Sequence, residues 1–242
     1  MAQIGGKPII GHIFDRVRLV PEVRETILAT SDQGSDDLLV EWAELYGAPV
    51  YRGSLNDVLD RFVKAASVAR PEHVVRITGD CPFIDPSLLS ELISVHCAEG
   101  NSHTALSGRF PDGLDCSIST MEALVAAQVQ ARRPSEREHV TLFLDNRPDL
   151  FRVGTLDCSD DLSHIRVTVD EPVDLDVVRG VYDHFSGSQA FFGFSEIQEA
   201  LLVVPELFQR NKHIPRNQGL QESLRRDFVA GLAPQKGSDP YG

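Results

Sequence analysis

The sequence has little that would mark an exported, membrane-bound or disulfide-stabilised protein. Its 242 residues include four cysteines, which lie far apart and show no C-x-x-C spacing, so we expect a reducing, cytoplasmic location. No apolar run approaches the roughly 18 to 20 residues that a membrane helix needs, and no basic segment followed by an apolar one opens the chain. We therefore expect no membrane partner.

Positive charge is also scarce. Lys and Arg number 23 against 36 Asp and Glu, which gives a net charge of -13. Nucleic-acid binding depends on clustered Lys and Arg, so we expect no nucleic-acid partner. A small-molecule ligand, with metal ions to screen any phosphate, fits this composition better.

What the sequence does contain is a repeated switch between short β-rich runs and helix-period stretches. This alternation predicts an α/β protein with a doubly wound, mostly parallel sheet. Expected strands are 26–31, 49–52, 73–78, 116–119, 151–156 and 165–169. Expected helices are 9–19, 35–46, 55–69, 86–98, 121–131, 136–146, 172–185 and 195–203.

The same pattern suggests one domain over 1–212. Residues of about 101–161 interrupt the alternation, so we interpret them as a small insertion beside the main sheet that carries substrate or dimer contacts. Residues 213–242 are polar and end in a Gly- and Pro-rich stretch, which predicts a poorly ordered tail. Helix starts are predicted from capping-box spacing at Ser54 to Asp57 and at Ser135 to Glu138, and from Asp85 before Pro86.

Two acidic residues stand where predicted strands end. Asp80 follows the run 73–78, and Asp170 follows the run 165–169. Open α/β sheets bind their ligands at the carboxyl ends of strands. Mg²⁺ prefers one or two carboxylates together with phosphate oxygens and water, so the pair predicts a metal site for a nucleoside triphosphate. The alternative is local: each acid would order its own turn or the start of the next helix.

Seven blocks in a fixed order make the sequence resemble the cytidylyltransferases, in particular their SpsF branch, which is similar to the CMP-sugar synthetases. The blocks are IGGKPI (4–9), ATSD (29–32), RGSLNDVLDR (52–61), RITGDCPFIDP (76–86), PDGLD (111–115), SEREHVT (135–141) and VTVDEP (167–172). The resemblance covers about 4–210.

This resemblance implies a Rossmann-like fold of the nucleotide-diphospho-sugar transferase type. It implies activation of a sugar or sugar acid by CTP to give a CMP-sugar and pyrophosphate, for surface polysaccharide biosynthesis, in a homodimer. Asp80 and Asp170 would hold Mg²⁺ on the triphosphate, with Lys7 as a further catalytic residue.

By the same resemblance, two further groups of residues would bind the substrates. The nucleotide would meet Thr30, Ser31, Asp32, Ser54, Asp57, Arg61 and Arg76. The acceptor sugar would meet Asp112, Asp115, Arg137, Glu138 and His139. Structural roles compete with these assignments, because Ser54, Asp57 and Glu138 also fit helix caps, His139 fits a packed core position, and Arg76 fits a structural ion pair.

Members of this family normally have a strand and a Gly-, Ser-, Arg- and Lys-rich loop ahead of the block at 4–9. Met1 lies three residues before that block, so we expect weak CTP binding and little turnover, since Lys7 alone replaces such a loop poorly. A misplaced start, a truncation and a non-catalytic partner protein remain open as explanations. Loss of a central strand would expose two strand edges.

Two other functions remain open. A metal-dependent glycosyltransferase would use a similar fold, but Asp174-Leu-Asp176 is the D-x-D here and we expect it to form a solvated acidic face of the helix 172–185. A regulatory or scaffold subunit would keep the acceptor surface without binding nucleotide.

Overall fold

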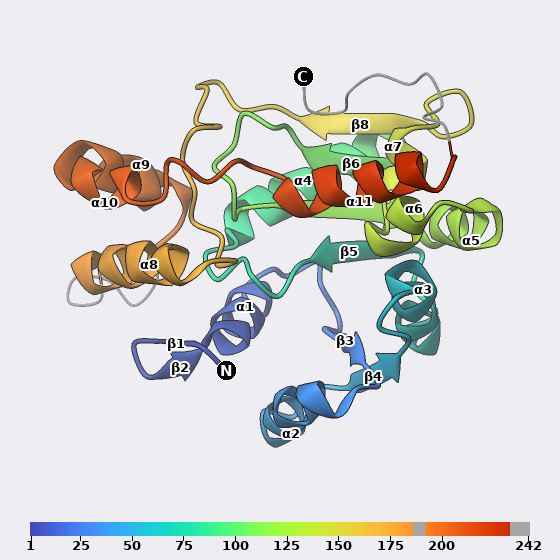
Figure 1. The fold of residues 1–242 in the computed structure, drawn as a ribbon, viewed down its shortest axis with the longest axis horizontal. Helices are drawn as coiled ribbons and strands as arrows, with labels where there is room; N and C mark the ends of the chain where they lie inside the picture. The colour runs from blue at the N-terminus through green and yellow to red at the C-terminus, as the bar shows by residue number, and fades with distance from the viewer. Residues whose placement is uncertain (186–191, 233–242) are drawn as a thin grey trace.

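The computed structural model describes residues 1–185 and 192–232. Four strands form its central sheet in the order β5-β7-β6-β8. β5 and β6 are both antiparallel to β7, and β8 is parallel to β6, so three strands run one way and β7 runs the other (Figure 1). Their bounds are β5 His73–Ile77, β6 His103–Leu106, β7 Cys116–Thr120 and β8 Val153–Leu156.

Two further strand pairs lie outside this sheet. β3 (Leu28–Ser31) and β4 (Val50–Gly53) are parallel, and β1 (Gln3–Ile4) pairs with β2 (Lys7–Pro8) in a hairpin. Within the described residues β3 pairs only with β4, and β5 only with β7. Each therefore keeps one edge without a ladder partner among the described residues.

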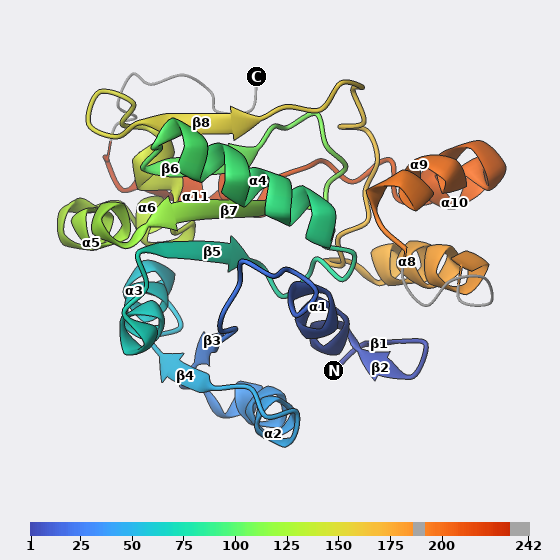
Figure 2. The same ribbon diagram turned by 180° about the vertical axis from the view of Figure 1, so that it is seen from behind.

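Helices cover both faces of the central sheet. α4 (Pro86–Glu99) crosses one face, and α11 (Gln218–Val229) crosses the other (Figures 1 and 2). The remaining helices are α1 Ile9–Val17, α2 Asp37–Leu45, α3 Val58–Ala69, α5 Met121–Gln130, α6 Pro134–Glu138, α7 Leu142–Asp145, α8 Pro172–Phe185, α9 Phe194–Val203 and α10 Pro205–Gln209, with a 3-10 turn at Gly34–Asp36. The α/β class and the mostly parallel strand arrangement are as predicted.

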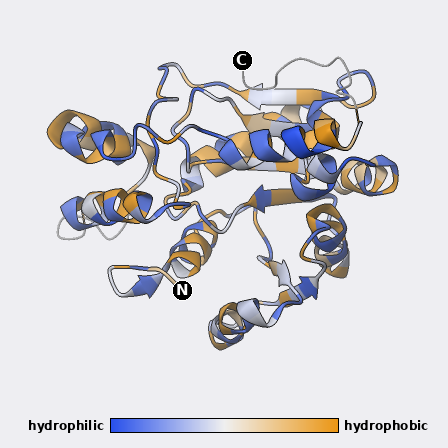
Figure 3. Cartoon of the chain, viewed as in Figure 1, coloured by the Kyte–Doolittle hydropathy of each residue, from blue (hydrophilic) through white to orange (hydrophobic). Residues whose placement is uncertain are grey.

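Successive side chains of β5 point to opposite faces of the central sheet, and each face is covered by a different apolar cluster. Val75 and Ile77 pack with the larger buried apolar cluster, which includes side chains of α1, α4, α8 and α9. Val74 points the other way, to a second cluster that includes Leu59 of α3 and Leu124 of α5. β-branched side chains on both faces suit a strand that is covered on both sides. Figure 3 shows the contrast with α11, along which hydrophilic residues predominate.

Some predicted elements differ from the observed ones. Residues 165–169 form no strand, only an isolated bridge between Asp112 and Arg166. The predicted helix 136–146 is divided into α6 and α7, because Val140 between them has a left-handed φ of 42°. Residues 101–161, expected to lie beside the sheet, instead provide β6, β7 and β8.

The C-terminal part also departs from expectation. Residues 218–229 form α11 rather than a poorly ordered tail, since Ser223 and Asp227 of this helix are buried against α6. The part of the expected tail at 233–242 lies outside the described residues.

Of the three predicted helix starts, one is confirmed. Asp85 caps α4 by accepting the backbone N–H groups of Ser87 at 2.7 Å and Leu88 at 3.0 Å. The capping box at Ser54 is wrong, because α3 starts three residues later than that box requires and is capped by Asp57. The box at Ser135 is also wrong, because the Ser135 hydroxyl donates to Asp227 instead. A search of the described residues for a helix long and apolar enough to cross a bilayer finds none.

Candidate functional site

The two predicted metal ligands, Asp80 and Asp170, lie next to each other. The connection from β8 to α8 docks on the loop after β5, because Val169 N–H donates to the carbonyl of Asp80 at 2.9 Å and the Thr168 hydroxyl donates to it at 3.3 Å. Burial, together with the charge and a hydrogen bond of Asp80, raises the pKa of Asp170, although Arg166 acts against this rise. Two carboxyl groups in contact are therefore the centre of the site.

Arg166 connects this pair to the rest of the site. Its Nη2 donates to Oδ2 of Asp170 at 2.6 Å, its Nη1 to Oδ2 of Asp112 at 2.6 Å, and both Nε and Nη2 to Asp174 at 2.9 Å. Burial lowers the pKa of Arg166, but the hydrogen bonds to Asp174 and Asp170 outweigh it and raise the pKa above its usual value. The guanidinium is a fixed fork that holds three carboxylates.

Asp174 was expected on a solvated face, and that prediction is wrong. Its side chain is fully buried, whereas Asp176, the other acid of the D-x-D, is exposed. Besides Arg166, Asp174 accepts the backbone N–H groups of Asp170 at 3.2 Å and Glu171 at 2.9 Å. It thus stabilises the first turn of α8, where N–H groups otherwise lack partners.

The predicted acceptor residues Asp112 and Asp115 form the adjoining loop. Burial raises the pKa of Asp112 to about 6, helped by the charge of Asp115 and opposed by Arg216 and Arg166. Arg216 donates to Oδ1 of Asp115 at 2.6 Å and to the carbonyls of Gly108 and Phe110 at 2.7 Å. This loop is therefore held from one side by Arg166 and from the other by Arg216.

Gly113 allows the close approach of this loop to the segment that carries Asp170. Its φ is 104°, a conformation that favours glycine. A Cβ at this position would lie 2.2 Å from the backbone nitrogen of Thr168. The loop and the segment 167–168 are instead joined by hydrogen bonds from Val167 and Thr168 to the carbonyl of Asp112.

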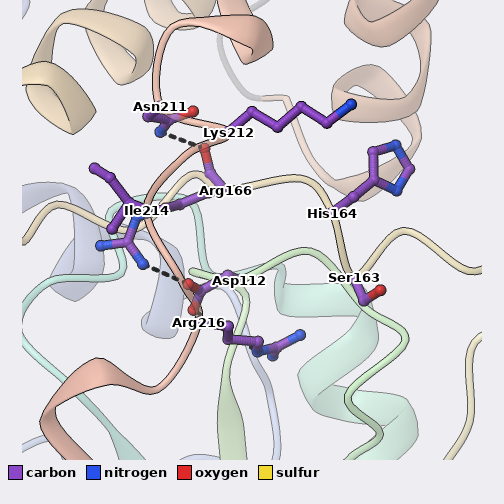
Figure 4. Close-up of a pocket in the computed structure, with 8 residues that line it drawn as sticks. All are labelled: Asp112, Ser163, His164, Arg166, Asn211, Lys212, Ile214 and Arg216. Atoms are coloured by element: carbon purple, nitrogen blue, oxygen red, sulfur yellow. Dashed lines mark hydrogen bonds and ion pairs between the residues drawn. The ribbon is translucent and has the colours of Figure 1, made fainter.

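Beside the loop is a pocket of about 200 Å³, drawn in Figure 4. Three segments contribute to it: the loop at Asp112, the connection before α8, and the strap between α10 and α11. Its lining residues are Asp112, Ser163, His164, Arg166, Asn211, Lys212, Ile214 and Arg216.

The predicted nucleoside contacts at the end of β3 are engaged within the chain. The hydroxyls of Thr30 and Ser31 donate to Asp36 at 2.7 and 2.6 Å. These bonds lower the pKa of Asp36. Asp32 continues the β3–β4 pairing by donating its N–H to the carbonyl of Gly53 at 2.9 Å. These residues line the carboxyl end of the small sheet.

The other predicted nucleotide contacts surround the start of α3. The Ser54 hydroxyl accepts the N–H of Asp57 at 3.2 Å, and Arg61 donates from Nη1 to the carbonyl of Ser54 at 3.0 Å. Within the described residues, the buried Nε of Arg61 has no hydrogen-bond partner. Arg76 of β5 is half-buried, and the part of the chain described here gives it no hydrogen bond or ion pair, so the structural ion pair weighed for it is not present.

The predicted residues of α6 are tied to neighbouring helices. Arg137 pairs with Asp57 at the cap of α3. The Ser223 hydroxyl of α11 donates to Glu138 at 2.7 Å and lies 3.1 Å from Nε2 of His139. Burial lowers the pKa of His139, and Arg76 acts in the same direction. Arg76 thus lies near α6, on the strand that leads to Asp80.

Lys7, the third predicted catalytic residue, lies against α1 rather than at the carboxyl pair. It forms an ion pair with Asp15 of α1, and Tyr46 donates a hydrogen bond to the same carboxylate. The structure therefore brings Lys7 to α1 and α2 and shows no contact between it and the carboxyl pair within the described residues.

Four residues of this site were not found by sequence reasoning: Arg166, Asp174, Asn211 and Arg216. A signal was present for Arg166, an arginine inside an apolar run that requires buried anionic partners. The amide of Asn211 donates to the carbonyl of Arg166 at 3.1 Å and to Asp174 at 2.9 Å. Asn211 lies at the end of the predicted domain 1–212, and Arg216 lies in the predicted tail 213–242. The composition of these segments gave no indication of a functional site.

Sequence and structure comparisons place this geometry among known proteins. Residues 1–194 match the family described as cytidylyltransferase. The chain is 35% identical over 159 residues to the spore coat polysaccharide biosynthesis protein SpsF of Bacillus subtilis. The aligned region covers 64% of this chain and 66% of the Bacillus protein. The chain thus covers just under two thirds of this relative.

Solved structures agree with this match. A cytidylyltransferase from Leptospira borgpetersenii superposes with a TM-score of 0.80 at 25% identity, covering 86% of this chain and 88% of that one. A CMP:2-keto-3-deoxy-manno-octonic acid synthetase solved with CTP has the same fold, with a TM-score of 0.57 at 15% identity and coverage of 76% and 90%. Since the family match covers most of the sequence, the chain belongs to the cytidylyltransferase family.

Proposed function

We propose that this protein transfers a cytidylyl group from CTP to a hydroxyl of a sugar or sugar acid, with release of pyrophosphate, for surface polysaccharide biosynthesis. The observation that carries the proposal is the contact between Asp80 and Asp170 where β5 ends and α8 begins. Open α/β sheets bind ligands at this end of their strands. SpsF, the Bacillus relative, is named for polysaccharide biosynthesis.

The carboxyl pair fits a divalent cation, and Mg²⁺ is the cation we propose. Carboxylate oxygens are the hard ligands that Mg²⁺ takes, one or two at a time, alongside phosphate oxygens and water. The described residues contain no group of three or more His, Cys, Asp or Glu side chains fit to hold a metal, which suits an ion held partly by its substrate. Bound Mg²⁺ would neutralise charge on the triphosphate.

Two cations are suited to the triphosphate itself. Arg76 has no hydrogen bond or ion pair within the described residues, and Arg61 has a buried Nε without a partner there. A buried or half-buried guanidinium without an anion is costly, and a phosphate would satisfy it. The ends of β3 and β4, where Thr30, Ser31 and Asp32 lie, are where we place the nucleoside.

The acceptor is proposed to bind at the loop of Asp112 and Asp115, across Arg166 from Asp170. Its hydroxyl oxygen would bond to the α-phosphorus while the bond from that phosphorus to the bridging oxygen of the β-phosphate breaks. Pyrophosphate leaves, and the hydroxyl proton passes to water. Holding the two reactants in line is the main contribution of the chain.

The test is release of pyrophosphate from CTP with Mg²⁺ and a panel of sugars and sugar acids, with mass spectrometry of the CMP-sugar product. Asp80→Asn should lower kcat by about 10³-fold or more, since an amide is a poor Mg²⁺ ligand. Its unfolding temperature should stay close to that of the unchanged protein, because the carbonyl of Asp80 keeps its hydrogen bonds. Asp176→Asn, an exposed acid of α8, is the matched control and should retain full activity. Full activity of Asp80→Asn would remove Asp80 from the site.

The product also separates the two competing functions. A glycosyltransferase would release a nucleoside diphosphate or monophosphate, and its usual D-x-D ligand pair is disfavoured here because Asp174 is buried on Arg166. A regulatory subunit would show no heat of CTP binding in calorimetry. The homodimer and the cytoplasmic location remain predictions, the first of which sedimentation analysis would test.

A further inference from the structure

His139 has one ring nitrogen that is held and one that is free. It follows the last residue of α6, and its Nε2 lies 3.1 Å from the Ser223 hydroxyl of α11. Among the described residues, its Nδ1 makes no hydrogen bond. Nδ1 also does not belong to the buried side-chain nitrogens that lack a partner in that part of the chain. It is therefore open to solvent or to a substrate.

Ser223 determines which nitrogen of His139 carries the hydrogen. Its hydroxyl has two acceptors, Oε2 of Glu138 at 2.7 Å and the carbonyl of Gly219 at 3.0 Å. A hydroxyl has one hydrogen and a carboxylate is the stronger acceptor, so toward His139 the Ser223 oxygen accepts and Nε2 donates. Burial lowers the pKa of His139 below its usual value of 6.5, so the ring is neutral at pH 7. Nδ1 then carries a free lone pair.

The charges around His139 respond to the proposed substrate. Glu138, beside it in sequence, and Asp227 of α11 raise its pKa, whereas Arg76 of β5 and Arg226 of α11 lower it. Arg76 is the side chain that we assign to the triphosphate. A bound triphosphate would neutralise Arg76 and so remove one of the two cations that oppose protonation of His139. The ring would become a better proton acceptor when the nucleotide is present.

His139 also lies on the side of β5 to which Arg76 points. Side chains two positions apart in a strand share a face, so Arg76 shares the face of Val74. Val74 packs against the apolar cluster that includes Val140, the neighbour of His139, and α6 lies beside β5 in both views of the ribbon (Figures 1 and 2). Four positions separate Arg76 from Asp80, at most about 14 Å of extended chain. The free nitrogen is therefore near the strand whose end carries the carboxyl pair.

The backbone after His139 is strained. Val140 has a φ of 42°, a left-handed conformation that β-branched residues rarely adopt. Its side chain is fully buried, and this packing holds the conformation that ends α6. Residues kept in such conformations cluster at active sites. This second observation, independent of the hydrogen bonds, favours a functional role for His139 over a packed core position.

We propose, on the basis of the proposed function, that Nδ1 of His139 is the general base that takes the proton from the acceptor hydroxyl, and that Ser223 is the positioning residue that fixes the ring. The hydroxyl oxygen bonds to the α-phosphorus of CTP while its proton moves to Nδ1. The bond from that phosphorus to the bridging oxygen of the β-phosphate breaks, and pyrophosphate leaves with the electron pair. The imidazolium then gives the proton to water. A general base contributes roughly 10²- to 10⁴-fold to the rate.

The first experiment measures the tautomer without turnover. Nitrogen-15 NMR of the histidine rings in the full chain, at neutral pH and without substrates, is assigned by comparison with His139→Gln. His139 should carry its hydrogen on Nε2 and none on Nδ1. Ser223→Ala should give a mixture of the two tautomers, and Ser223→Thr, which keeps the hydroxyl, should restore the single one. A hydrogen on Nδ1 in the unchanged protein would overturn the inference, because no lone pair would then face the substrate.

The second experiment measures kcat and KM in the pyrophosphate assay. His139→Ala should lower kcat by about 100-fold or more and leave KM for CTP within about twofold of its original value. Added imidazole should restore kcat by about tenfold, since it supplies the missing base, whereas it would not repair lost packing. His184→Ala, which removes an exposed histidine near the end of α8, is the matched control and should keep full activity.

The outcomes separate this inference from the proposed function. Pyrophosphate release by His139→Ala at nearly the original kcat would overturn the base assignment and leave the transferase function intact. A loss of kcat that imidazole does not restore would also overturn it, because His139 would then act through packing. No release by the unchanged protein would overturn the proposed function itself, and the base assignment with it.

Discussion

Nη2 of Arg166 lies 2.6 Å from Oδ2 of Asp170 and 2.9 Å from Oδ2 of Asp174. One nitrogen thus links a carboxylate at the surface of the site to one that is fully buried. Since Asp174 also holds the backbone N–H groups of Asp170 and Glu171, the start of α8 and the side chain of Asp170 are positioned together. The geometry of the carboxyl pair depends on this arrangement.

The first prediction concerns Arg166. Arg166→Gln leaves the buried Asp174 without its cation and Asp112 with Arg216 alone, so the free energy of unfolding should fall by about 3 to 5 kcal/mol. Arg166→Lys keeps the charge but not the planar guanidinium. Its free energy of unfolding should therefore fall by less than that of Arg166→Gln. Urea unfolding followed by circular dichroism measures both.

Arg109→Gln is the control for Arg166, because Arg109 pairs with Asp157 at the surface and should change stability by less than about 1 kcal/mol. If Arg166→Gln were as stable as Arg109→Gln, the three carboxylates would not depend on the guanidinium.

The second prediction concerns Gly113. Gly113→Ala should lower stability by about 2 kcal/mol or more and separate the loop of Asp112 from segment 167–168, since the new Cβ would meet the Thr168 backbone. Gly47→Ala is a matched control, because Gly47 also has a positive φ of 78° but has nothing within 4 Å of an added Cβ. It should lose about 1 kcal/mol from its backbone conformation alone. Equal losses in the two variants, measured by thermal unfolding, would contradict the close approach.

The third prediction concerns α11. Asp227 is buried and accepts both the N–H and the hydroxyl of Ser135 of α6. Asp227→Ala leaves these donors unsatisfied, so we expect a loss of about 1 to 3 kcal/mol and faster amide exchange in 218–229 than in β7. Glu222→Ala, on the exposed side of the same helix, should change stability by no more than about 0.5 kcal/mol. Uniform exchange in Asp227→Ala would show that α11 does not open separately.

Sequence reasoning succeeded where local patterns and strand ends determine structure. The β-branched run of β5, the cap at Asp85 and the two acids at 80 and 170 each carry a short-range signal, and the structure brings the two acids together. The seven sequence blocks predicted the family, which the comparisons confirm. Nucleotide and acceptor contacts at the other predicted residues stay predictions.

Prediction from the sequence failed where contacts between distant residues override the local sequence pattern. The run 165–169 is rich in β-branched residues, but its backbone pairs with Asp112 and Asp80 rather than with a strand, and so forms no ladder. α11 is polar in sequence because it buries only a narrow side, including Asp227, against α6. The roles of Asp174 and Arg216 depend on partners far along the chain, which a single sequence does not show.

The last prediction is a pH dependence that arises at His96. This side chain is fully buried, contacts Thr104 at 3.0 Å and His73 at 3.1 Å, and burial, with the charges of His73 and His103, lowers its pKa from 6.5 to about 4. A depressed pKa means that the unfolded chain binds the proton first, between pH 6.5 and about 4. Stability is therefore fully present above pH 6.5 and falls as the pH drops through this window, by up to roughly 3 kcal/mol.

Urea unfolding at pH 7 and at pH 4.5 measures this loss. The raised pKa of Asp112 acts in the opposite direction over part of the same range, so the comparison that isolates His96 is its replacement. His96→Gln should be less stable than the unchanged protein at pH 7, because the contacts to Thr104 and His73 change, but should lose less stability on acidification. If both proteins lost the same amount between pH 7 and pH 4.5, protonation of His96 would not be the cause, and the buried histidine would contribute to stability through packing alone.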